Sequence, residues 1–140
     1  MRLVRKIINI VLIILIGFLA ITTILGGIAL LTGWIPMDVS MLAGSIFPDY
    51  TVPGLALTFI AGGSATLAFI LLLRKSRFAV LSSATAGIII MFFEFVEVLV
   101  IGSPAGVART LQIIYFGLGT LIVVISMGLW FIDLLEKRPV

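Results

Sequence analysis

The chain has 140 residues, of which 62% are hydrophobic and only 11% are charged, and its formal net charge is +3. Soluble domains carry roughly 25% charged residues, so this composition excludes a soluble globule, and the mean hydropathy of +1.39 makes the bilayer the expected solvent. The composition contains no Cys and no His, which excludes disulfides, thiolate metal sites, bis-His haem ligation and imidazole proton relays.

Four apolar segments predict four transmembrane helices, at about residues 7–31, 52–73, 78–101 and 110–132. Each segment is longer than the roughly 20 residues that cross about 30 Å of hydrocarbon. No polar segment between them is long enough to form a soluble domain. The sequence therefore predicts an all-α polytopic membrane protein, a single domain of residues 1–140 whose four helices form an up-down antiparallel bundle.

Basic residues gather where the apolar segments begin or end. Three clusters precede the first span, fill the second connection and follow the last span: Arg2, Arg5 and Lys6; Arg74, Lys75 and Arg77; Lys137 and Arg138. Because Lys and Arg are retained in cytoplasmic loops, this distribution predicts a multi-pass protein with both termini and the second connection in the cytoplasm.

The basic turn at Arg74, Lys75 and Arg77 is expected to anchor the chain to anionic lipid headgroups. The pI of about 9.8 could suggest nucleic acid, but the cations lie only in short clusters between spans, so the lipid bilayer is the expected partner and nucleic acid is not. A homo-oligomer or a membrane-protein partner stays open.

Small residues four positions apart are expected to let the helices approach closely. Such pairs occur in each of the first three spans, and two glycines lie close together in the fourth: Thr22 and Gly26, Thr23 and Gly27, Ala61 and Ala65, Ser83 and Gly87, and Gly117 with Gly119. These patterns fit packing within one bundle and packing between copies equally well.

The long first connection, residues 32–51, is predicted to contain a short interfacial helix. Asp38 can cap a helix over residues 39–43, which Gly44 would end. This helix is too short to cross the membrane, and its apolar side chains allow it to lie at the interface or to fold over the mouth of the bundle.

Four residues of this connection are expected to form an outer cap: Trp34, Asp38, Asp49 and Tyr50. Trp34 and Tyr50 suit the headgroup level, and Thr51 is expected to cap the second span, where Pro53 fits a first helical turn. The cap is interpreted as a rigid anchor, and a functional lid is the alternative.

Several short motifs carry a resemblance to a known family. They are the segment Phe47-Pro48-Asp49-Tyr50 with Pro53-Gly54-Leu55, Glu97 followed by Ile101-Gly102, and Leu111-Gln112 with Tyr115 and Gly117. Over the last two-thirds of its length the chain resembles small four-span prokaryotic membrane proteins, a family without an established biochemical role. The resemblance implies a four-span protein of the prokaryotic plasma (inner) membrane and assigns no catalytic residue.

Small multidrug transporters have a similar size, but their essential glutamate lies in the first helix. The first span here, residues 7–31, contains no acidic residue, so that resemblance does not hold.

Glu94 and Glu97 lie inside the third apolar segment, and ionisable side chains at membrane depth are costly and usually functional. Their spacing of three places them on one helical face. Counting back from Ile101 at about 1.5 Å per residue puts Glu97 about 6 Å and Glu94 about 10 Å from the outer end. Both acids are therefore expected in the outer third of the membrane.

The third and fourth spans are expected to form an antiparallel hairpin, which brings three further polar residues to the same depth. Arg109 would lie at the outer mouth, Gln112 level with Glu97, and Tyr115 level with Glu94. Because Arg can hold a carboxylate bidentately, Glu97 with Arg109 is the expected ion pair. The five residues together form the predicted polar cluster.

Three interpretations of the polar cluster stay open. It could be a structural clasp of the hairpin, a proton- or cation-coupled site in a small transporter or channel that uses Glu94 or Glu97, or part of an outward-facing pocket. That pocket would lie under the 32–51 loop and would hold a lipid, a quinone-like ligand or a partner's helix.

An enzyme is not expected. Paired carboxylates can perform acid–base catalysis, but no nucleophile, metal set or phosphate loop accompanies them. We therefore expect no catalytic residue, no metal and no cofactor, and a structural, accessory or binding protein is favoured over transport.

Overall fold

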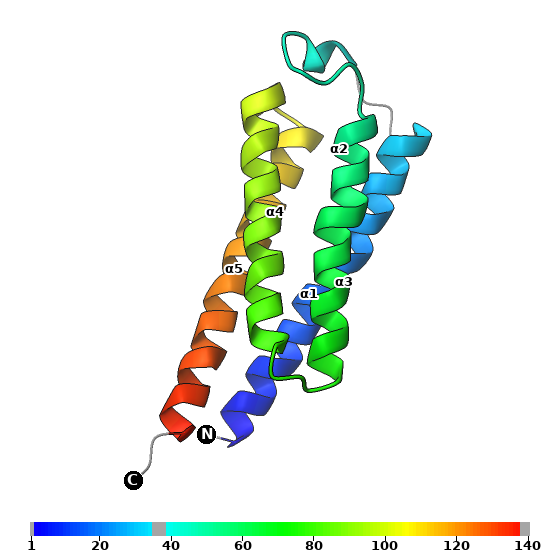
Figure 1. Ribbon diagram of the computed structural model, residues 1–140. Coiled ribbons are helices and arrows are strands. Elements are labelled where there is room, and N and C mark those ends of the chain that lie inside the picture. Colours follow the sequence, from blue (N-terminus) through cyan, green and yellow to red (C-terminus); the bar gives the residue numbers. More distant parts are fainter. Residues whose placement is uncertain (1, 35–38, 138–140) are drawn as a thin grey trace.

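The computed structural model describes residues 2–34 and 39–137, and every regular element in this part of the chain is a helix (Figure 1). In chain order the elements are α1 (Arg2–Thr32), the short η1 (Val39–Leu42), α2 (Thr51–Leu55), η2 (Ala56–Ala61), α3 (Gly62–Leu73), α4 (Ala79–Ile101) and α5 (Val107–Lys137).

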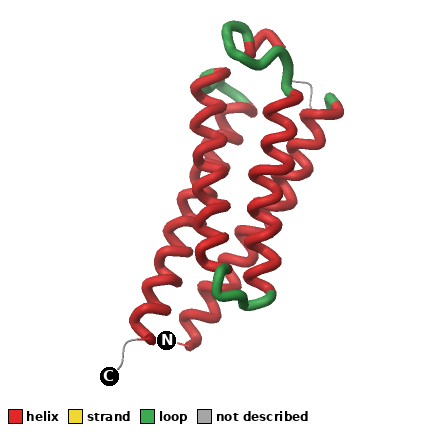
Figure 2. The backbone as a smooth tube through the Cα atoms, viewed as in Figure 1, coloured by secondary structure: helices red, strands yellow, loops and turns green. Residues whose placement is uncertain are grey.

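Four rods form an up-down bundle, with α2, η2 and α3 joined end to end as the second rod (Figure 1). Each of the four is long and apolar enough to cross a membrane, which confirms the predicted fold. α1 packs against α3 and α5, and α4 packs against the same two neighbours. The first turn of α1, the last turn of α5 and the α3–α4 turn share what we call the terminal end. The 39–50 segment and the turn at 102–106 lie at the opposite loop end (Figure 2).

The first and last helices extend beyond the predicted apolar limits of 7–31 and 110–132. α1 already begins at Arg2, and α5 runs from Val107 to Lys137. The length of an apolar segment indicates where the hydrocarbon part of the membrane ends. The backbone hydrogen bonds of a helix can continue beyond that point, so a helix can be longer than its apolar segment. Both helices therefore carry their basic and acidic residues on additional turns outside the apolar core.

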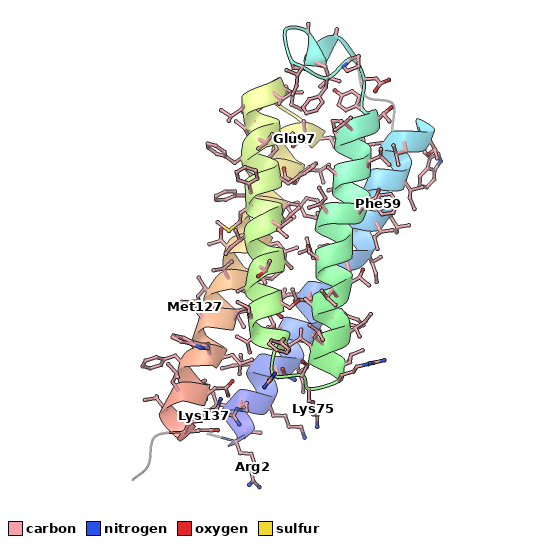
Figure 3. All side chains as sticks on the ribbon, viewed as in Figure 1. Arg2, Phe59, Lys75, Glu97, Met127 and Lys137 are labelled. Carbon is pink, nitrogen blue, oxygen red and sulfur yellow. The ribbon has the colours of Figure 1, made fainter. Side chains whose placement is uncertain are left out.

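The inside of the bundle consists of aliphatic and small side chains, and large apolar side chains also cover the outside. Leu12, Ile16 and Ile122 are fully buried, whereas Phe59 and Met127 are 69% and 54% exposed and point away from the bundle (Figure 3). Such exposure would be costly in water, so the outer surface is suited to lipid.

Two close backbone approaches confirm the predicted role of small residues. A Cβ built at Gly119 would lie 2.7 Å from the Gly87 carbonyl oxygen, and a Cβ at Gly27 would lie 2.8 Å from that of Gly54. α4 therefore meets α5, and α1 meets the second rod, at positions that only glycine fits. Gly117 is different, because a Cβ there would meet no described heavy atom within 4 Å.

The second rod contains a π-helical segment, η2, that apolar segment length could not predict. The Gly62 N–H donates to the Leu57 carbonyl, five residues back, and the Thr58 hydroxyl donates to the Gly54 carbonyl at 2.8 Å. Since a π-turn accommodates an extra residue, it changes which side chains of the rod face α4. Single π-turns inside α-helices are frequent at functional sites.

The loop end carries the short helix that the sequence predicted, as the 3₁₀ turn η1 (Val39–Leu42). Gly44 follows with φ of +83°, a conformation that glycine adopts without strain. Leu42 is buried, so this turn covers the bundle. The expected cap residue Asp38 lies outside the described residues.

Candidate functional site

A cavity of about 460 Å³ lies near the loop end, between the α2–η2 part of the second rod and α4. Its walls are almost entirely apolar, and Leu42, Phe47 and Tyr50 reach it from the loop. We call this cavity, with its two helical walls and its loop, the groove. A site of this size falls within the roughly 300–1,000 Å³ of small-molecule sites.

The spacing of residues along α4 explains its side of the groove. The lining residues come in neighbouring pairs every three to four positions, as one stripe of a helix requires: Ile88 and Ile89, Phe92 and Phe93, Val96 and Glu97, and Val100 and Ile101. On the opposite wall Ala56 and Ala61, the two ends of η2, contribute only methyl groups. Small side chains on one wall thus leave space in front of large ones on the other.

Glu97 is the charged residue among the described residues that line the groove. Its side chain is half-buried, and it lies near the loop end of α4 (Figure 3). The end of α4 at Ile101 lies four positions further along the chain, about 6 Å along the helix axis. The groove therefore has one polar position, close to its loop end.

Glu94 faces the interior of the bundle rather than the groove. It is 5% exposed, and its Oε2 atom has no hydrogen-bond partner among the described residues. The Glu97 carboxyl, one helical turn away, interacts with it directly. Buried polar atoms are rarely left without a partner, so Glu94 brings an unsatisfied carboxyl oxygen to the back of the groove wall.

The expected ion pair between Glu97 and Arg109 is not present. Arg109 is exposed, and its Nε and Nη2 atoms donate to the Ser103 carbonyl at 3.0 Å and 2.6 Å. Depth alone suggested the pair, but the stripe of α4 that carries Glu97 faces the second rod rather than α5. Arg109 therefore holds the turn between α4 and α5.

Gln112 and Tyr115 do not join the carboxyl pair either. Gln112 is 4% exposed, and its Nε2 atom donates to the Gly102 carbonyl at 3.0 Å, while its Oε1 atom has no described partner. Tyr115 packs against the hydrophobic core. The predicted cluster therefore divides into a carboxyl pair on α4 and a hairpin clasp made by Arg109 and Gln112.

The residues of the predicted cap have separate roles. Tyr50 lines the groove, whereas Trp34 is 85% exposed. The Asp49 Oδ1 atom accepts a hydrogen bond from the Thr51 N–H at 3.0 Å, which lowers the pKa of the Asp49 carboxyl below its ordinary 3.8. The expected cap by Thr51 is wrong, because Thr51 is already the first residue of α2 and Asp49 accepts its N–H.

The basic turn at the terminal end is exposed as expected for an anchor. Arg74, Lys75 and Arg77 all face outward, and the Arg77 guanidinium lies 4.7 Å from the centroid of the Phe78 ring. Lys75 adopts a positive φ of 53°. This sharp turn keeps the three cations close together, and Figure 3 shows Lys75 at the same end of the bundle as Arg2 and Lys137.

Sequence reasoning missed an ionic contact between the first and last helices. Arg5 of α1 pairs with Asp133 at 2.5 Å and also with Glu136, both on α5. The sequence contained two indications of this contact. Asp133 and Glu136 are three residues apart and so lie on one helical face, and an even number of membrane crossings brings the two ends of the chain to the same side. This contact ties α1 to α5 at the terminal end.

The described residues contain no group of three or more His, Cys, Asp or Glu side chains that could hold a metal ion. No known protein family, curated protein or solved structure matches the chain. The groove and its carboxyl pair therefore have to be interpreted from their own chemistry.

Proposed function

We propose that the protein is a membrane-embedded binding protein that holds the apolar part of an amphiphile in the groove. The observation that carries this proposal is the cavity of about 460 Å³ with almost entirely apolar walls and one polar position. An apolar body held between helices, with few polar groups that fix its orientation, is typical of small-molecule sites.

The position of the groove supports access from the bilayer. Residues on both of its walls are more than half exposed, including Ile60 at 59% and Phe92 at 67%. An amphiphile dissolved in the membrane can thus reach the groove sideways, between the second rod and α4. The loop residues Leu42, Phe47 and Tyr50 then cover its polar end.

The proposal includes an orientation in the plasma membrane of a prokaryote. The terminal end, with its three basic clusters, lies in the cytoplasm, so the groove opens in the outer half of the membrane. Since the sequence has no Cys, single cysteines report sidedness directly. Ser103→Cys should react with an impermeant maleimide on intact cells and Ser76→Cys only after lysis, and the opposite pattern would reverse the orientation.

Photo-crosslinking tests the binding proposal. A neutral long-chain alcohol with a diazirine in its tail should label residues 88–101 of the protein in phosphatidylcholine vesicles. Ala56→Trp, which fills the groove, should reduce this labelling several-fold. The matched control Phe59→Trp places the same side chain on the lipid-facing side of the same segment and should leave it unchanged. Equal labelling in both variants would overturn the proposal.

Proton- or cation-coupled transport is the second candidate, and the unpartnered Oε2 atom of Glu94 favours it. A buried carboxyl group with an unpartnered oxygen and a second carboxyl beside it can bind and release a proton or cation. Flux in proteoliposomes that depends on pH and disappears in Glu94→Gln would support this function. A stable Glu94→Gln variant with unchanged flux would contradict it.

A further inference from the structure

We propose that the amphiphile held in the groove carries a positive charge at its polar end, an alkylammonium group or its equivalent, and that Glu97 binds this end. The inference rests on the proposed function and adds the chemical class of the ligand. It is drawn from the carboxylate in the groove, from the lack of a cationic side chain beside it among the described residues, and from the second carboxyl behind it.

Charge complementarity selects the ligand's polar end. Glu97 is the charged group among the described residues that line the groove, and the lining contains no Lys or Arg. A carboxylate in an apolar site is strongly stabilised by a cation, because a low dielectric strengthens the attraction between opposite charges. An anionic end at the same position would be repelled for the same reason.

No cation of the described part of the chain fulfils this role. Arg109, the expected partner of Glu97, donates to the Ser103 carbonyl instead. The ion pairs of the described residues are those of Arg5 with Asp133 and Glu136, at the terminal end. Buried charges are normally paired, and the half-buried Glu97 lies beside an empty volume in which a ligand's charge could lie.

The second carboxyl strengthens the preference for a cation. Glu94 interacts directly with Glu97. Its side chain is only 5% exposed, and its Oε2 atom has no hydrogen-bond partner among the described residues. Two carboxyl groups at close range repel each other when both are charged. A cation placed at Glu97 stabilises the charged form of the neighbouring carboxyl groups, which a neutral hydroxyl group cannot do.

The length of the groove fits an amphiphile bound with its polar end toward the loop. Glu97 lies about 6 Å from the end of α4, and the lining continues from there to Ile88, nine residues or about 14 Å toward the terminal end. The lining side chains of α4 between Ile88 and Val96 are apolar. An alkyl tail can therefore extend along α4 while the ammonium group stays beside Glu97, under Tyr50 and Phe47.

Competition by three ligands with one common tail tests this inference. Dodecylamine, dodecanol and dodecanoate are compared as competitors of the neutral diazirine alcohol in vesicles of phosphatidylcholine, whose zero net charge limits unspecific enrichment of the amine. In the wild type, dodecylamine should compete at about tenfold lower concentration than dodecanol, as a charge-assisted hydrogen bond implies, and dodecanoate should be the weakest.

The variant Glu97→Gln tests whether Glu97 causes the preference for dodecylamine over dodecanol. This variant should lose the tenfold advantage of dodecylamine while dodecanol competes as before, which also shows that the groove is intact. Glu136→Gln is the matched control, because it removes one carboxylate at the other end of the bundle and should keep the preference.

The outcomes separate the two proposals. If the neutral probe does not label the groove of the wild type, the proposed binding function fails. If it labels the groove but amine and alcohol compete equally, or the preference survives in Glu97→Gln, only the cationic ligand is overturned. A preference for dodecanoate would likewise overturn it.

Discussion

Polar side chains inside the apolar part of this protein differ in whether they form hydrogen bonds with the backbone. Arg109 and Gln112 donate to carbonyl groups that the end of α4 and the following turn leave free. Glu94 has no such donor for its Oε2 atom. The clasp residues therefore stabilise the hairpin, and the carboxyl pair is left for a ligand.

The first prediction concerns Gln112. Gln112→Met keeps the size of the side chain but leaves the Gly102 carbonyl without its donor, so the free energy of unfolding should fall by about 1–3 kcal/mol. Equilibrium unfolding in mixed micelles measures this change. Ile113→Met, one residue further on the lipid-facing side, is the control, and an equal loss in both variants would contradict the clasp.

The second prediction concerns pH at the loop end. Because the Thr51 N–H and hydroxyl hold the charged form of Asp49, the pKa of Asp49 should lie below 3.8. A lowered pKa stabilises the fold at pH values above the ordinary 3.8, and this contribution is lost as pH falls through the lowered value. A carboxyl-carbon NMR titration measures the pKa, which should rise part of the way back in Thr51→Val. A pKa at or above 3.8 in the wild type would contradict the bond.

At the scale of elements, α4 has two faces with different tasks. One face meets α5 at Gly87 and Gly119, and the stripe with Glu97 forms a wall of the groove. The tight contact on the first face fixes the helix, while the small residues of η2 leave space along the second. The groove thus depends on close packing elsewhere in the bundle.

The third prediction tests the close packing of α4 and α5. Gly119→Ala places a methyl group 2.7 Å from the Gly87 carbonyl oxygen and the Met91 side chain, so the helices must separate, at a cost of about 1–3 kcal/mol. Gly117→Ala adds the same methyl group where it meets no described atom within 4 Å and should have little effect. Thermal unfolding of the two variants measures the difference. Equal melting temperatures for Gly119→Ala and Gly117→Ala would contradict the close contact between α4 and α5.

The number of spans and the limits of the second and third could be predicted from apolar segment length, but the arrangement of the polar cluster could not. Counting residues gives the depth of Glu97 and Arg109 and does not give the direction in which each faces. That direction depends on how the helices pack, and in this bundle the Glu97 side chain faces the second rod. The π-turn η2 was also beyond prediction, because apolar composition does not distinguish its hydrogen bonds from those of an α-helix.

At the scale of the whole molecule, the two ends of the bundle are built differently. The terminal end carries exposed cations and the Arg5 contact with Asp133 and Glu136. The loop end carries the hairpin clasp and the cover of the groove. A protein closed at one end and hollowed near the other is suited to bind a molecule that enters from one half of the bilayer.

The fourth prediction concerns the closed end. Arg5→Gln removes both ion pairs between α1 and α5, but the three side chains are about one-third exposed, so the free energy of unfolding should fall by no more than about 1 kcal/mol. Higher salt should reduce the difference between wild type and variant. A salt-independent loss of several kcal/mol would contradict this account.

The binding function of the groove is the central claim, and the ratio of photolabelling in Ala56→Trp to that in Phe59→Trp tests it most directly. The neutral diazirine alcohol should label residues 88–101 several-fold less in Ala56→Trp, because only this variant fills the groove. A ratio of one, with both variants folded, would show that the amphiphile does not occupy the groove.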